Sequence, residues 1–121
     1  MTDSPKVPEL HEQKAHPYNR LGEVSKLYEQ GEFESSLDKC NRLIEDIPTF
    51  ADIYGVKGVV LTALAQYDAA TDAFARCREL RPDLWTTDWY ESFTLRLLGK
   101  EEEAVAMEAK SRATYAEKFS A

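Results

Sequence analysis

The chain has 121 residues, of which 43% are apolar, and a formal net charge of −7. This length fits one domain with a modest core, and the acidic balance disfavours nucleic acid as a ligand because phosphates would be repelled on average. The longest largely apolar run, residues 59–65, is far shorter than the roughly 20 residues that cross a bilayer. We therefore expect no membrane insertion, and the absence of a signal-peptide pattern favours a cytoplasmic location.

The first 16 residues differ from the rest of the chain. They carry Pro5 and Pro8, mixed charges and few large apolar side chains. This composition predicts a flexible N-terminal arm over residues 1–16. The folded domain is expected to begin at Pro17, because proline suits the first turn of a helix, where a missing N–H costs nothing.

Two helices are predicted after the arm. Over residues 18–30 the apolar side chains recur at intervals of three and four residues, and Gly31 ends the pattern. A second helix is expected over residues 34–47, where Pro48 stops it.

Residues 51–84 form the most regular segment of the chain. Its key positions, spread over about 34 residues, are Tyr54, Gly58, Leu61, Tyr67, Ala70, Phe74 and Pro82. This pattern resembles the tetratricopeptide repeat, and it predicts helices over residues 51–64 and 68–80. Gly58 is expected to let these two helices approach closely, and Thr49 with Asp52 resembles a capping box at the start of the first.

A shift of 34 residues tests whether the flanking segments repeat this unit. It places Pro82 on Pro48 and Ala70 on Ala104, with weaker matches elsewhere. The resemblance therefore implies an all-α fold, a right-handed α-solenoid of three antiparallel helix pairs. The expected repeats cover residues 17–50, 51–84 and 85–121.

The last helix, expected over residues 101–119, is more polar than an inner repeat would be. We interpret it as the cap that ends the stack, with an acidic start that suits the helix dipole. Its inward-facing residues are predicted to be Ala104, Met107, Ser111 and Tyr115. In the earlier helices, Cys40 and Cys77 lie on apolar faces and are expected to be buried free thiols.

The resemblance also implies a protein–protein interaction module in which the first helix of each pair lines a concave groove. The predicted groove residues are Tyr18, Leu21, Ser25, Tyr28, Asp52, Gly55, Val59, Thr62, Trp89, Phe93 and Arg96. Because many of them are aromatic or aliphatic, the expected ligand is an apolar peptide or helix of another protein. The alternative for the aromatic members is ordinary core packing between repeats.

Several functional alternatives stay open at this stage. The chain could act as an adaptor, as a small chaperone that holds an apolar segment of a secreted or assembling protein, or as a self-associating structural subunit. A homodimer, or an arm of residues 1–16 that occupies the groove, belongs to the last group. Capture of a C-terminal carboxylate is disfavoured, because the five positions that related clamps fill with Lys, Asn and Arg here carry Leu21, Ser25, Val56, Thr86 and Tyr90.

No residues indicate an enzyme. His11 and His16 lie in the arm without spaced cysteine or carboxylate partners, and no phosphate-binding loop, nucleophile elbow or zinc-protease motif is present. The cluster of residues 101–103 is more simply a solvated helix start than an acid–base pair. We therefore expect no catalytic residue, cofactor or metal.

Overall fold

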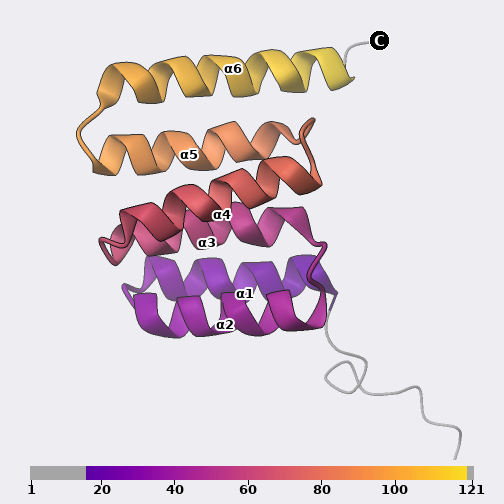
Figure 1. Cartoon of the computed structure of the whole chain (residues 1–121), viewed down its shortest axis with the longest axis vertical. Helices are drawn as coiled ribbons and strands as arrows, with labels where there is room; N and C mark the ends of the chain where they lie inside the picture. The colour runs from indigo at the N-terminus through magenta and orange to yellow at the C-terminus, as the bar shows by residue number, and fades with distance from the viewer. Residues whose placement is uncertain (1–15, 120–121) are drawn as a thin grey trace, which may run out of the picture.

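The computed structural model describes residues 16–119, which fold into six α-helices without a β-strand (Figure 1). The helices are α1 (Pro17–Glu29), α2 (Phe33–Asp46), α3 (Ala51–Ala63), α4 (Tyr67–Leu80), α5 (Trp85–Leu97) and α6 (Glu101–Phe119). The all-α prediction is confirmed, and each of the five helices whose bounds the sequence predicts begins and ends close to the predicted residue. The predicted flexible arm lies outside the described residues except for His16, whose Nδ1 accepts a hydrogen bond of 3.3 Å from the backbone N–H of Tyr18.

Consecutive helices are joined by short turns and run antiparallel (Figure 1). α3 lies at the centre of the packing, because it contacts α2, α4 and α5 and also touches α1. Within the described part of the chain, α6 packs against α5 alone, and Figure 1 shows it as the outermost helix at the yellow end. The core is therefore built around α3, and α6 has one covered face.

The turns within the three helix pairs share one backbone geometry. Gly31, Ala65 and Gly99 follow α1, α3 and α5 and have φ angles of +79°, +61° and +78°. This left-handed region suits glycine, so the central turn holds its alanine at some cost in backbone energy. A residue of the same conformation thus recurs at the interval of the sequence repeat.

Gly58 has the steric role that the sequence predicts. A Cβ atom on this residue would lie 2.6 Å from two ring carbons of Phe74 in α4. The Phe74 side chain is only 2% exposed, so it fills the space that the glycine leaves. α3 and α4 therefore approach each other over this glycine.

A hydrogen-bonded ladder connects the first helices of the three pairs. The Tyr18 hydroxyl donates to Asp52 Oδ2 at 2.9 Å, and the Thr86 hydroxyl donates to Asp52 Oδ1 at 3.1 Å. Each bond joins residues 34 positions apart, so α1, α3 and α5 are held at equivalent points along their lengths.

The predicted capping box is wrong, because α3 starts after Phe50 without a side-chain cap.

Replacing Asp52 by alanine is expected to lower the free energy of unfolding by about 1–3 kcal/mol, because two hydroxyl donors lose a buried charged acceptor. Urea unfolding followed by circular dichroism measures the change. Asp38, which is exposed on α2, supplies the matched control, and its alanine variant should differ little from the parent chain. Equal losses in the two variants would show that the ladder contributes no stability.

The buried carboxylate of Asp88 also has a structural explanation. The sequence places it where the central repeat has Tyr54, and the side chain lies between helices. It accepts a hydrogen bond of 2.9 Å from Arg78 Nη2 in α4, and the same guanidinium pairs with Glu91. The mismatch in the repeat pattern is therefore accommodated by a charge partner rather than by a shift in register.

Candidate protein-binding surface

An apolar cleft of about 230 Å³ lies where α1 and α5 flank α3. Its lining residues are Ser25, Tyr28, Glu29, Val56, Val59, Val60, Tyr90 and Phe93. We call it the α1–α3–α5 cleft. Of the predicted groove residues, the structure brings Ser25, Tyr28, Val59 and Phe93 together here, from the three helices that the sequence pattern indicated, although Val59 is only 8% exposed.

Three other predicted groove residues are buried in contacts between helices. Asp52 belongs to the hydrogen-bonded ladder and is 8% exposed. A Cβ on Gly55 would meet the ring of Tyr90 at 2.6 Å, and Thr62 lies 3.1 Å from Thr94 across the contact of α3 with α5. These positions therefore face a neighbouring helix rather than an open surface.

Trp89 and Phe93 lie on the outer surface of α5 and are not core residues. Each is 41% exposed, and their rings meet edge to face with centroids 4.7 Å apart. The ring of Trp89 also contacts the ring of Tyr90 at 5.4 Å. Together Trp89 and Phe93 form an aromatic ridge, and Phe93 connects that ridge to the α1–α3–α5 cleft.

The remaining predicted groove residues are more dispersed. Tyr18 is exposed, but its ring packs edge to face on Phe50 and its hydroxyl is held by the ladder. Leu21 is partly buried against the core of α1, α2 and α3. Neither side chain lines the cleft.

Arg96 is the only cation among the predicted groove residues. Its guanidinium already pairs with Glu101 in α6 at 3.0 Å and with Glu108 in the same helix. The hydrogen bond from Arg96 lowers the pKa of Glu108. Arg96 therefore serves the contact of α5 with α6, which the sequence pattern did not reveal.

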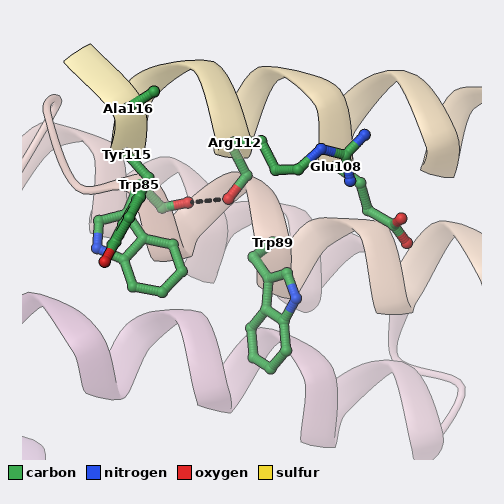
Figure 2. A pocket seen from close by; sticks show the side chains of 7 residues that line it. Trp85, Trp89, Glu108, Arg112, Tyr115 and Ala116 are labelled. Carbon is green, nitrogen blue, oxygen red and sulfur yellow. Dashed lines mark hydrogen bonds between the residues drawn. The ribbon is translucent and has the colours of Figure 1, made fainter. Parts of the chain in front are cut away.

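A second, larger cleft of about 890 Å³ opens between α5 and α6 (Figure 2). Its lining residues are Trp85, Trp89, Glu108, Ser111, Arg112, Tyr115 and Ala116. Figure 2 shows both indole rings projecting from α5 and the Glu108 and Arg112 side chains projecting from α6. We call it the α5–α6 cleft.

The packing of α6 agrees only in part with the prediction. Ala104 and Ser111 are buried, and the Ser111 hydroxyl donates to the backbone oxygen of Trp85 at 2.8 Å. Tyr115 is 47% exposed and meets the Trp85 ring edge to face, so it borders the cleft instead of entering the core. The sequence does carry a signal for this surface, because aromatic residues recur four positions apart at Trp85, Trp89 and Phe93.

Within residues 16–119, no three His, Cys, Asp or Glu side chains are grouped so that they could hold a metal ion. The same residues include no helix with the length and apolar character needed to cross a membrane. No protein-family model matches the chain, and no curated protein matches it.

Proposed function

We propose that the chain is a three-repeat tetratricopeptide protein, a solenoid of helix pairs capped by α6, that binds an apolar peptide or helix of another protein. The proposed architecture is supported by the 34-residue spacing of the Tyr18–Asp52–Thr86 ladder. The recurring left-handed turns give it further support. In this arrangement α1, α3 and α5 line the concave face.

The α1–α3–α5 cleft and its exposed aromatic ridge carry the functional proposal. A volume of about 230 Å³ is smaller than the roughly 300–1,000 Å³ of most small-molecule sites, so it suits one or two apolar side chains. The rest of the bound segment would lie over Trp89 and Phe93. With about 40% of each ring open to water, covering them would contribute about 2 kcal/mol each.

The adaptor and chaperone alternatives share this contact. They differ in whether the bound segment belongs to a stable partner or to a protein awaiting assembly. The contact itself is the testable part.

Panning a random-peptide display library against the purified chain is expected to enrich sequences with large apolar residues. Replacing Phe93 by alanine should weaken binding of the enriched peptides about tenfold or more, because an aromatic contact at the mouth of the cleft is lost. The melting temperature should change little, because the ring is 41% exposed.

Tyr67 provides the matched control for this experiment. It is an aromatic residue on α4 that is 48% exposed and does not line the α1–α3–α5 cleft. Its alanine variant should bind the enriched peptides as the parent chain does. Equal binding by the Phe93→Ala variant would contradict the proposal, as would a loss of about 3 kcal/mol in stability, which identifies a core residue.

A further inference from the structure

One side of α6 carries apolar residues that are about half exposed in the described chain. Val105, Tyr115 and Phe119 are 48%, 47% and 59% exposed. Together with Glu108 and Arg112 they are spaced three and four residues apart along the helix, so the five side chains share one face. We call this the α6 face.

The charges of the α6 face are arranged symmetrically. Glu108 and Arg112 lie at equal distances in sequence from residue 110, one on each side. If two copies of α6 cross antiparallel at that point, Glu108 of each meets Arg112 of the other. The same crossing sets Val105 opposite Tyr115 of the second copy, so a small side chain meets a large one. The two copies would therefore form two Glu108–Arg112 pairs, which are related by the two-fold axis of the dimer.

We propose that a second copy of this chain docks on the α6 face and forms a two-fold symmetric dimer with antiparallel α6 helices. In this dimer each α6 also covers the open side of its partner's α5–α6 cleft, where Trp85 and Trp89 lie (Figure 2). The dimer and a bound apolar segment would therefore compete for the ring of Trp89, while Phe93 and the α1–α3–α5 cleft stay open. The face then has a partner whose surface is complementary to it in both charge and size.

The charged groups are available for these contacts. Arg112 is exposed, and among residues 16–119 it forms no hydrogen bond and no ion pair within 4 Å, although its charge helps to lower the pKa of Glu108 one turn away. Glu108 already accepts from Arg96, but a carboxylate has two oxygens and can accept from a second guanidinium. The pKa of Glu108 is lowered by that hydrogen bond, so its carboxylate is ionised at neutral pH.

The exposed apolar area on and beside the α6 face is also large enough for a dimer interface. Side chains as large as these bury up to roughly 150–250 Å² each, so the open parts of Trp89, Val105, Tyr115 and Phe119 sum to roughly 400 Å² per copy. A standard interface buries about 800 Å² per partner, of which a little over half is apolar. The α6 face with the neighbouring indole therefore matches the apolar content of one such interface.

Sedimentation equilibrium of the purified chain tests the proposal without any other partner. The average mass should rise with concentration from 13.8 kDa towards twice that value. Arg112→Glu and Glu108→Arg should each dissociate about tenfold or more readily, since both symmetric contacts become like-charged. An equimolar mixture of the two variants should regain the dimer, because both contacts then join opposite charges.

Lys100 supplies the control, because it is exposed in the turn before α6 and lies off the α6 face. Lys100→Glu changes the net charge as Arg112→Glu does and should leave the dimer intact. If Glu108→Arg loses helicity, Arg112→Gln replaces it and should weaken the dimer about threefold or more. A parent chain that stays at 13.8 kDa up to about 1 mM would overturn the proposal, as would unchanged self-association of the well-folded Arg112 variants.

Discussion

Replacing Gly58 by valine is expected to lower the free energy of unfolding by about 3 kcal/mol. The new Cβ would lie 2.6 Å from two ring carbons of Phe74 and 2.9 Å from a third. The ring is 2% exposed, so it has no open space into which it could move. Overpacking of this kind costs about 1–3 kcal/mol, and the branched side chain places the effect at the upper end. Urea unfolding followed by circular dichroism measures the loss.

Gly22 is the matched control for this substitution. It also lies within a helix, but a Cβ there would meet no atom within 4 Å, so Gly22→Val should be neutral or slightly stabilising. A rescue is available from the first helix pair, where Val24 and Cys40 occupy the positions equivalent to Gly58 and Phe74 in one buried cluster. The double variant Gly58→Val, Phe74→Cys should regain part of the stability. Similar losses in Gly22→Val and Gly58→Val would show that the ring contact is not the cause.

The helix bounds could be predicted from the sequence because local residues determine them. Helix length here is set by local signals, a proline or a left-handed turn residue at each end, and these act within a few residues. Gly31 and Gly99 mark two of the turns directly. The central turn at Ala65 lacks a glycine, and there only the repeat interval reveals it. Local signals combined with one fixed interval therefore predicted all six helices.

The candidate binding surface was less predictable because it depends on how each helix is rotated about its axis. The repeat interval assigns equivalent positions, but it does not say which stripe of α3 meets α5. Tyr90 packs over Gly55 and turns that stripe inward, which leaves Val56, Val59 and Val60 at the cleft. A bulky residue on α5 thus changes which residues of α3 line the cleft.

The 34-residue interval did not reveal the α5–α6 cleft for a related reason. The interval maps α6 on α2 and α4, both of which lie against a following helix. α6 has no following helix in the described chain, so residues that an inner repeat would cover stay open. Its pairing of Arg96 with Glu101 and Glu108 joins residues without equivalents in the central repeat. Features that occur only once leave no signal at the 34-residue interval.

The stability of the chain is expected to fall by about 4 kcal/mol between roughly pH 9 and pH 12 because of Cys40. Burial raises the pKa of this thiol from its ordinary value of 9.0 to about 12. In that range the unfolded chain loses the proton while the folded chain retains it, so alkali stabilises the unfolded state by about 1.4 kcal/mol for each pKa unit. Below pH 9 the contribution is fully present.

A second buried group acts in the same direction, because burial raises the pKa of Tyr90 from 10.0 to about 12. Urea unfolding at a series of pH values, with a phosphine reductant to keep the thiols free, measures both effects. Cys40→Ala should be less stable at neutral pH, because it leaves a cavity. Its loss of stability between pH 9 and pH 12 should nevertheless be smaller than that of the parent chain, and it should still begin near pH 9, because burial also raises the pKa of the Cys77 thiol. A decline of the same size in both proteins would mean that the folded chain does not protect the Cys40 thiol from ionisation.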